Sequence, residues 1–431
     1  MSEIYEPGRN VPVTARFDVI VCGAGPAGIA AAVGAARAGA KTCLIEAHGC
    51  LGGIWTAGNL AYILDGASKQ GFLPELLALL DSYDARQGFV CDVETLKLVL
   101  EQLCLDAGVH VRLYTRVSAA VRDSGGKLTH IVTESKTGRE AWASHLFIDT
   151  TGDGDLAAHA GCGFDIGEES SGKMQPMSMV AIVTGVHPED SRPFTIIEKA
   201  SRLRMLEEIH KGGFFPSYTS PALWHIRDDL YIMMANHQYN VSGLSADDLT
   251  RATIEARQEI HQIIGVLRSS GGIWKDLRLV ATPAQIGVRE GRRIHGLYKV
   301  TKEDIMNGVV HEDGICRVRF NMDVHALEKS GSGADFEKSV EAYRKRAQPY
   351  DIPLRAMIAK DIDGLLMAGR CISGDFLAHS SYRVTGNAVQ TGQAAGALAA
   401  AAVRCGSLPQ LVPWREVEAT LRSLWGSPRN E

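Results

Sequence analysis

The sequence has little of what marks membrane, secreted or nucleic-acid-binding proteins. Its longest apolar run, Ala394 to Val403, is far shorter than the roughly 20 residues that a helix needs to cross a bilayer. The first 16 residues contain no apolar core and no cleavage signal, so they predict no secretory leader. No lysine- and arginine-rich run with interleaved aromatics occurs, and the formal net charge is only −5. We therefore expect a cytoplasmic protein with no membrane span and no nucleic-acid partner.

The cysteines are too scattered to form a framework. There are nine, an odd number, and none stands in a Cys-x-x-Cys pair. This distribution argues against a disulfide framework, a zinc ribbon, an iron–sulfur cluster or a dithiol relay. We predict no metal site, and most of the cysteines should be small buried side chains.

Length and composition are those of an ordinary globular enzyme. At 431 residues the chain exceeds one compact core, which suggests roughly two or three domains. Charged residues make up 22% and hydrophobic residues 45%, as is usual for such enzymes. The number of subunits is left open, and a homo-oligomer is compatible with the sequence.

One strand–turn–helix–strand unit organises the N-terminal part. Phe17 to Cys22 is a short apolar run, and Gly23, Gly25 and Gly28 follow it at G-x-G-x-x-G spacing. Gly23 allows a sharp turn out of the strand, and Gly25 leaves no Cβ between the backbone and a pyrophosphate. Gly28 lets the Ala-rich helix that follows pack close to the sheet. The phosphates would bind the free N–H groups at the helix N-terminus.

Glu46 ends the second apolar run, about 18 residues after Gly28. A carboxylate at this place can accept hydrogen bonds from both hydroxyls of a ribose, and it disfavours a 2′-phosphate. The unit therefore predicts a site for FAD or NAD rather than NADP.

The rest of the first domain is expected to contain short strands and one long helix. Gly49 to Gly58 reads as a Gly-rich loop that could approach a flat cofactor, or as a plain connection. Asp92 should cap a helix that stops at Gly108. The strands predicted after it are 109–114, 117–120, 128–134 and 141–148, the last of which runs into a Gly- and Asp-rich turn at 151–155.

A second domain is predicted to interrupt the first. Strands are expected at 174–186 and 229–236, together with an amphipathic helix from Ser245 to Leu267 that Ser245 should cap. The chain then returns with an apolar strand and Gly turn at 364–370 and a small-residue helix at 387–404. We predict an N-terminal arm at 1–16, a discontinuous cofactor domain at 17–164 and 351–431, and an inserted substrate domain at 165–350.

Several separated motifs together resemble one family. They are the Gly-rich turn, Leu51-Gly52-Gly53, the "ID-x-TGDGD" turn at 148–155, the stretch 287–301 and the stretch 365–400. The chain resembles the FAD-dependent oxidoreductases of the glutathione-reductase-like, two-dinucleotide-binding-domain superfamily. The resemblance covers about 17–163 and 281–403. It implies an α/β fold, with a Rossmann-like FAD-binding domain (a parallel sheet with a β-meander insertion) and an inserted α+β substrate domain.

The resemblance also implies which residues hold the ADP half of FAD. Gly23, Gly25, Gly28 and Glu46 would bind it, and the backbone of Val117 would meet the adenine.

Further positions would lie along the rest of the cofactor. Gly52 and Gly53 match the ribityl and isoalloxazine region, Gly152 and Asp153 would lie near the pyrophosphate, and Gly369 and Arg370 match the late turn that reaches the flavin. Gly386 and Asn387 would begin the final helix, whose positive end would face the flavin N1 and C2 carbonyl and so favour an anionic reduced flavin.

The candidate chemical groups precede that final helix. A flavin dehydrogenase needs a base and cationic donors that orient a polar substrate. His379 is our candidate base or acid, and Tyr382 and Arg383 would hold a substrate carboxylate or hydroxyl; a structural role for all three is the alternative. Arg289, with Arg292 and Arg293, forms a basic cluster that would receive an anionic substrate, or else a solvated face.

Two further expectations concern a loop and the inserted domain. His48 and Cys50 flank the Leu-Gly-Gly loop, where a covalent flavin link is conceivable. Trp224, His225 and His237 would line a substrate cavity or pack in a core.

The sequence therefore predicts an FAD-dependent oxidoreductase of dehydrogenase or oxidase type. It would transfer a hydride between a small polar substrate, anionic or hydroxylated, and flavin N5. The alternatives are a flavin-dependent monooxygenase and a flavoprotein that uses FAD without net redox change. No second G-x-G-x-x-G occurs, so the electron acceptor stays unknown.

Overall fold

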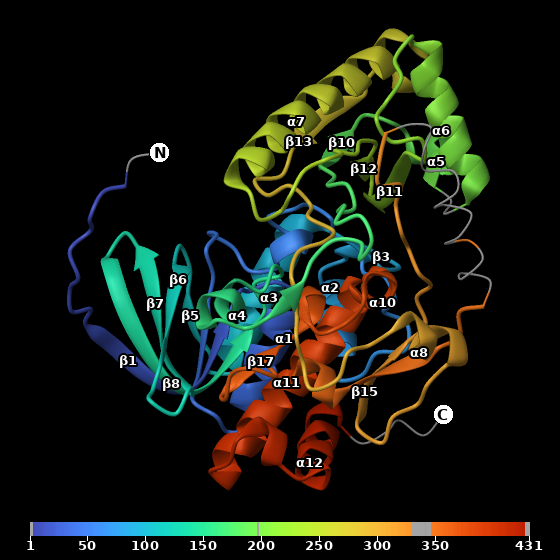
Figure 1. The fold of residues 1–431 in the computed structure, drawn as a ribbon. Coiled ribbons are helices and arrows are strands. Elements are labelled where there is room, and N and C mark those ends of the chain that lie inside the picture. Colours follow the sequence, from blue (N-terminus) through green and yellow to red (C-terminus); the bar gives the residue numbers. More distant parts are fainter. Residues whose placement is uncertain (1–2, 196–197, 330–340, 342–345, 427–431) are drawn as a thin grey trace.

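The computed structural model describes residues 3–195, 198–329, 341 and 346–426. Residues 1–2 of the expected arm, 196–197, 330–340 and 342–345 of the expected substrate domain, and 427–431 of the expected cofactor domain lie outside the described residues. Figure 1 shows a larger part built on a mostly parallel sheet and, above it, a smaller part built on an antiparallel sheet. The expected α/β class with a Rossmann-like sheet is confirmed.

The parallel sheet is built around the first strand. β1 (Val13–Cys22) pairs in parallel with β2 (Thr42–Ile45) on one side and with β8 (Gly138–Asp149) on the other, and β5 (His110–Arg112) continues the sheet beyond β2. The strand begins four residues before the apolar run that predicted it, because residues 13–16 already pair with β8. The expected arm therefore ends at residue 12. The end of β1 is buried on both faces, as parallel strands between helices require.

A three-stranded meander shares β8 with this sheet. β6 (Arg116–Arg122) and β7 (Leu128–Ser135) pair antiparallel, and β7 pairs with the first part of β8. The last three residues of β8 instead pair in parallel with β17 (Leu365–Met367). A strand from late in the chain thus joins the sheet beside the end of β8, on the side of β8 away from β1.

Two helices of small residues lie against each other behind the sheet. α1 (Pro26–Arg37) packs on α11 (Thr385–Cys405), and both are almost completely buried (Figure 1). A Cβ added at Gly392 would come within 2.1 Å of the carbonyl oxygen of Ala27, and one at Gly396 within 2.2 Å of that of Ala31. The two backbones therefore touch, which only glycine permits at these positions.

The smaller part is a four-stranded antiparallel sheet with helices on one face. Its order is β11 (Ala222–Arg227), β12 (Leu230–Met234), β10 (Val180–Thr184) and β13 (Arg278–Ala281). Ala181 and Val183 on β10 pack with α6 (Lys199–Lys211) and α7 (Ala246–Ser269) in a second core. Val180 and Ile182, which point the other way, join the main core. The sheet therefore bridges its own helices and the cofactor-binding part.

The second core ends earlier than the expected domain boundary. It contains residues between Met177 and Val288, whereas Ile294, Val318 and Tyr350 belong to the main core. The segment after about residue 290 had been assigned to the substrate domain, but it packs with the cofactor-binding part. It does so because its short strands and helix surround the start of α11, which no local sequence pattern reveals.

The remaining elements connect these parts. They are α2 (Phe72–Ser82), β3 (Arg86–Gln87), β4 (Val90–Cys91), α3 (Val93–Asp106), α4 (Asp155–Ala160), β9 (Phe164–Asp165), α5 (Pro188–Thr195), β14 (Arg293–Ile294), α8 (Lys302–Asn307), β15 (Gly314–Val318), β16 (Tyr350–Pro353), α10 (Phe376–Tyr382) and α12 (Trp414–Trp425). The predicted caps of α3 and α7 are confirmed, because Asp92 accepts a hydrogen bond from the N–H of Thr95 and Ser245 accepts one from that of Asp248. In the part of the chain that the structure describes, no helix combines the length and apolar character that crossing a membrane requires.

Candidate functional site

The turn between β1 and α1 has the geometry that a dinucleotide requires. Gly23 has a φ of +99°, and a Cβ at Gly28 would lie 1.8 Å from the carbonyl oxygen of Gly23. Gly25 differs from both, since its φ is −71° and a Cβ there would meet nothing within 4 Å. Gly23 and Gly28 are thus required by the fold, while Gly25 borders open space.

That open space lies at the N-terminus of α1. Gly25 occupies the N-cap position, Pro26 follows it, and no side chain caps the helix. The exposed N–H groups and the helix dipole therefore face this space, which suits a pyrophosphate.

The Leu-Gly-Gly loop lies directly over the same turn. Gly52 donates its N–H to the carbonyl oxygen of Ala24 at 2.8 Å, and Gly53 approaches Gly25 so closely that a Cβ on it would be 2.8 Å from the Cα of Gly25. The loop therefore lies against the turn for which the sequence predicts cofactor binding, and its own contact with the cofactor stays a prediction.

Glu46 lies at the end of β2, beside the turn. Its Oε2 accepts a hydrogen bond from the N–H of Ala24 at 2.6 Å, and its Oε1 accepts from the N–H and Nδ1 of His48 at 2.8 and 2.9 Å. Burial acts against ionisation, but these hydrogen bonds hold the pKa of Glu46 below its ordinary value. The carboxylate is therefore charged and fixed, with lone pairs left for ribose hydroxyls.

Val117 and His48, two further candidate residues, lie near Glu46. The N–H of Thr115 donates to the carbonyl oxygen of Glu46 at 2.9 Å, and Val117 follows two residues later on β6. His48 is engaged with Glu46, at the expected ribose end, and Cys50 lies 3.7 Å from Thr56. The partners of His48 and Cys50 therefore lie near Glu46 and in the Leu-Gly-Gly loop, and not at the start of α11, where the flavin ring is expected.

The TGDGD turn is built on the buried carboxylate of Asp149. It accepts hydrogen bonds from the N–H and hydroxyl of Thr151 and from the N–H of Ala157, at 2.7 to 3.0 Å. Thr150 ties the same turn to β1 by donating to the carbonyl oxygens of Cys22 and Gly23. Burial raises the pKa of Asp149 to about 6 in spite of these bonds.

Replacing Asp149 with asparagine should lower the free energy of unfolding at pH 5 by about 1–3 kcal/mol, because one amide oxygen cannot serve all three donors. The loss should be smaller at pH 8. A carboxyl whose folded pKa is raised stabilises the fold most below its unfolded pKa, near 4, and this stabilisation is lost as pH rises through about 6. Denaturant titrations at both pH values measure the effect.

The control is Asp190→Asn, at an exposed position, which should change stability by less than about 0.5 kcal/mol. Equal stability of the two variants would contradict the role of Asp149.

Asp153 and the late strand-turn meet next to this turn. Asp153 and Arg370 form an ion pair at 2.7 Å, and a Cβ on Gly152 would lie 2.8 Å from the guanidinium of Arg370. Gly369 has a φ of +78° and lies between the first turns of two helices, close to Ala27 of α1 and Ala388 of α11. The ends of β1, β8 and β17 and the starts of α1 and α11 therefore converge here.

The start of α11 offers unpaired polar groups toward this region. Gly386 touches the backbone of Leu64 and Asp65, and no side chain caps the helix. Asn387 is fully buried, and its Nδ2 has no hydrogen-bond partner within the described residues; the same is true of the hydroxyl of Thr385. Buried donors without partners are rare unless a ligand or water meets them. These residues thus fit the polar edge of a bound flavin, for which the resemblance selected Gly386 and Asn387.

A set of polar side chains is joined by hydrogen bonds, ion pairs and ring contacts at the end of α10. We call it the arginine–histidine cluster: Tyr218, His237, Arg289, Asp323, His325 and Arg383. Its members come from five places in the chain, and Arg383 is the C-cap of α10, just before α11. Cationic and aromatic groups therefore lie next to the helix that is expected to face the flavin.

The bonds within the cluster leave one arginine without a carboxylate. Arg289 donates to the carbonyl oxygen of Pro176 at 2.6 Å, to Oγ of Ser178 at 2.9 Å and to Nε2 of His237 at 3.2 Å, and its other contact is Sδ of Met234. Burial and the charge of Arg383 lower the pKa of Arg289 to about 10. Arg289 is therefore still a cation at neutral pH, held by neutral groups.

Arg383 and His325 share Asp323. Arg383 lies 3.5 Å from this carboxylate and donates to the carbonyl oxygen of Asp323 at 2.8 Å. Nε2 of His325 lies 3.3 Å from the same carboxylate. His325 contacts the ring of His237 with 4.9 Å between centroids, and Tyr218 stacks on His237 at 3.9 Å.

The three arginines at positions 289, 292 and 293 do not act together. Arg292 donates to the backbone and side chain of the 153–155 turn, and the buried Arg293 pairs with Glu290 at 2.7 Å. Only Arg289 belongs to the cluster. The predicted basic cluster is therefore divided among three separate environments.

His379 and Tyr382 lie in helix α10, which ends just before α11. Asp375 caps α10 by accepting from the N–H of Ala378, a signal that was present in the sequence and overlooked. The hydroxyl of Tyr382 donates to the carbonyl oxygen of Ile372 at 2.9 Å, as in a structural tyrosine. His379 is fully buried; its ring nitrogens make no hydrogen bond of good geometry, although the ring lies near the backbone of Arg370. Burial and the nearby arginines lower the pKa of His379, so its imidazole is neutral.

Trp224 and His225 do not join the cluster. Trp224 packs against Tyr62 with 5.3 Å between ring centroids, and Nε2 of His225 lies 2.7 Å from the carbonyl oxygen of Asp228. Of the three candidates in the inserted domain, Trp224, His225 and His237, only His237 belongs to the arginine–histidine cluster. Tyr218, Asp323 and His325 were not predicted, because each is an isolated residue in an irregular segment.

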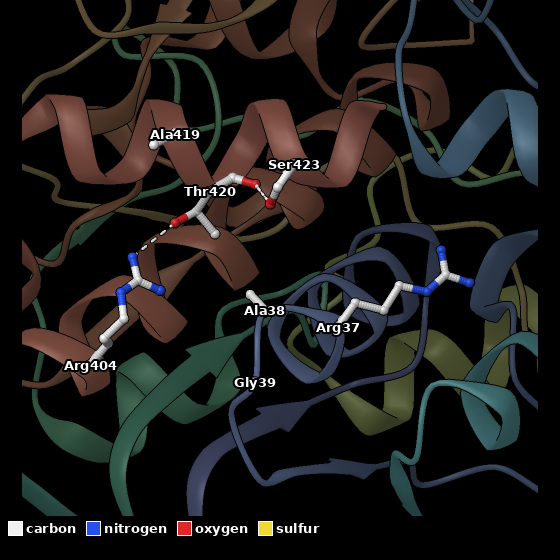
Figure 2. Close-up of a pocket in the computed structure, with 7 residues that line it drawn as sticks. All are labelled: Arg37, Ala38, Gly39, Arg404, Ala419, Thr420 and Ser423. Atoms are coloured by element: carbon white, nitrogen blue, oxygen red, sulfur yellow. Dashed lines mark hydrogen bonds between the residues drawn. The ribbon is translucent and has the colours of Figure 1, made fainter. Parts of the chain in front are cut away.

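A surface hollow lies elsewhere, at the opposite end of α1. Figure 2 shows it between the end of α1 and α12, where Arg404 donates to the hydroxyl of Thr420 at 3.1 Å. Arg37 points away from it, toward Glu75. The phosphate turn is at the N-terminus of the same 12-residue helix, about 18 Å away at 1.5 Å per residue. The hollow is therefore not part of the site.

Comparison with known proteins agrees with this geometry. A family model described as FAD dependent oxidoreductase matches residues 18–421. No curated protein matches the sequence. Among solved structures, the chain is similar to a geranylgeranyl bacteriochlorophyll reductase-like protein from Thermoplasma acidophilum, with 13% identity, a TM-score of 0.50 and coverage of 95% of this chain and 84% of that one. It is also similar to p-nitrophenol 4-monooxygenase from Pseudomonas putida, with 12% identity, a TM-score of 0.46 and coverage of 96% and 90%.

At these identities the structural likeness describes the fold alone, but the family model covers most of the chain. The predictions of an enzyme and of FAD as its cofactor are confirmed. The protein belongs to the FAD dependent oxidoreductase family.

Proposed function

We propose that the protein is a dehydrogenase- or oxidase-type flavoenzyme that oxidises or reduces a small polar organic molecule. The observation that carries the proposal is the arginine–histidine cluster at the start of α11. Arg289 and Arg383 can orient a polar substrate by charge-assisted hydrogen bonds, and neutral imidazoles next to them can accept a proton. Bound FAD would supply hydride acceptance or donation.

The chain's own residues would divide the work between the two parts of the fold. Gly25, Gly52, Gly53 and the first N–H groups of α1 would hold the pyrophosphate, and Glu46 would hold the ribose. The unpaired amide of Asn387 would donate to the polar edge of the flavin. The antiparallel sheet, packed over the main core, would exclude water from the reacting atoms.

The test is anaerobic spectroscopy of the purified holoprotein. Absorption bands near ~450 and ~370 nm should show oxidised flavin, and a panel of small hydroxylated and amino compounds should contain one that bleaches the ~450 nm band. Bleaching by NAD(P)H with oxygen insertion into the substrate would support a monooxygenase instead. Turnover without bleaching would support a flavin without net redox change, and either result would overturn the proposal.

We also propose that the enzyme works in a reducing compartment such as the cytoplasm. All nine cysteines are free thiols in the structure, and seven of them are buried. Disulfides are rare in reducing compartments, so this composition suits one. Fractionation of the source cells tests the location.

A further inference from the structure

The arginine–histidine cluster has an excess of donors and of positive charge. Arg289 has no carboxylate among its partners in the described chain, and Nε of Arg383 is buried without a partner. Nε2 of Gln175 is also buried without a partner, and the Oε1 of the same amide accepts the N–H of His325 at 3.0 Å. Two buried donors near the 323–325 segment thus lack an acceptor, and the Arg289 cation beside them lacks a counter-charge, which together point to an anionic, acceptor-rich ligand.

The cluster is reachable by a small molecule. The side chain of Asp323 is 41% exposed, whereas that of His325 is 14% and that of Arg383 11% exposed. Solvent therefore enters beside Asp323, and the arginine and histidine lie behind it.

The two histidines have different proton positions. A guanidinium only donates, so Nε2 of His237 must accept from Arg289, and its Nδ1 carries the hydrogen that faces the hydroxyl of Tyr239 at 3.3 Å. Adding a proton to His237 would break its bond to Arg289. His325 instead donates from Nε2 to Asp323, so Nδ1 carries its lone pair and the protonated ring would form an ion pair.

We propose that the cluster binds the carboxylate of a small organic acid between Arg289 and Arg383, and that His325, positioned by Asp323, takes up a proton when this anion binds. The inference rests on the proposed function, because it assigns a substrate class to the same site. The ligand satisfies the unpaired donors and neutralises the excess charge.

The groups that face His325 explain the direction of the coupling. Burial and the charge of Arg289 lower the pKa of His325 to about 4, and Asp323 only partly offsets them. Arg383 also lowers it, while His237 and Tyr218 lie against the ring as neutral groups. Glu328, three residues further on, is paired with Lys173. An anion on the two arginines removes their repulsion, so the pKa of His325 rises and binding tightens as pH falls toward 5.

The experiment titrates the FAD-loaded protein with glycolate at pH 5.0 and pH 7.5 by calorimetry in two buffers of different ionisation enthalpy. Glycolate should bind more tightly at pH 5.0 and with net proton uptake, and neutral glycolamide should bind at least about tenfold more weakly. Equal binding of glycolate and glycolamide would overturn the carboxylate assignment without any variant being needed.

Variants then locate the two effects. Arg289→Gln should weaken glycolate binding about tenfold or more, and Arg278→Gln, at an exposed position of β13, should not change it. His325→Gln should retain glycolate binding at pH 7.5 and lose the proton uptake at pH 5.0; uptake that persists in this variant would exclude His325. Asp323→Asn should reduce the uptake in the same way. Because binding is measured without turnover, a failure here is distinct from a failure to reduce the flavin.

Discussion

Alanine in place of Gly28 is expected to lower the free energy of unfolding by about 3 kcal/mol or more and to abolish FAD binding. The added Cβ would lie 1.8 Å from the carbonyl oxygen of Gly23 and 2.7 Å from Oγ1 of Thr150. Neither atom can move freely, because Gly23 donates to Ile45 of β2 at 2.8 Å and Thr150 donates to Gly23 at 2.6 Å. The helix would have to leave the sheet.

The matched variant is Gly25→Ala. Its φ of −71° suits alanine, and the new Cβ would meet no atom within 4 Å, so stability should change by less than about 1 kcal/mol. FAD binding should nevertheless weaken at least about tenfold, because the methyl group would enter the space where the pyrophosphate meets the helix N-terminus. Denaturant titration of the apoproteins and fluorescence titration with FAD separate the two effects. If Gly25→Ala bound FAD like the unaltered protein, the phosphate site would have to lie elsewhere.

The glycines of the turn between β1 and α1 show what local sequence can predict. The strand, the turn and the helix are contiguous, so their spacing fixes their geometry, and the roles given to Gly23 and Gly28 agree with the structure. The caps of α3 and α7 were predictable for the same reason, because Asp92 and Ser245 act within three residues of themselves.

The cluster could not be predicted in this way. Arg289 meets His237 across 52 residues, and Arg383 meets Asp323 across 60. His325 and Asp323 stand in an irregular segment with no periodic pattern, so only the packing of the antiparallel sheet on the main core reveals them. The arginines at 289, 292 and 293 are recognisable in the sequence, but in the structure they bind different partners. The sequence does not show which of them lacks a carboxylate partner.

The extent of the inserted domain is difficult to predict from sequence for a related physical reason. The sequence analysis predicts one continuous insertion at 165–350, whereas Ile294, Val318 and Tyr350 pack in the main core. A chain segment belongs to the core in which its apolar face is buried. Short strands such as β14 and β15 have too few residues for a hydrophobic pattern that would predict which core they join.

Alanine in place of Gly396 is expected to lower the free energy of unfolding by about 3 kcal/mol, although alanine is the better helix former. Its Cβ would lie 2.2 Å from the carbonyl oxygen of Ala31 and 2.9 Å from the N–H nitrogen of Ala35, both on the backbone of α1. Relief requires α11 to move away from α1 along its length. Because Gly392 on the same face touches Ala27 in the first turn of α1, this movement would also disturb the phosphate-binding end, and FAD affinity should fall with stability.

Gly265→Ala provides the control for helix propensity. Gly265 lies within the long helix α7, and a Cβ there would meet nothing within 4 Å, so the change should stabilise the protein by about 0.5–1 kcal/mol. Thermal and denaturant unfolding of both variants measure the difference. A loss below about 1 kcal/mol for Gly396→Ala would mean that the two helices can separate without cost, which contradicts a backbone contact between α1 and α11. A loss near 3 kcal/mol, beside a gain for Gly265→Ala, would place the stability of the cofactor-binding part in the close approach of these two helices.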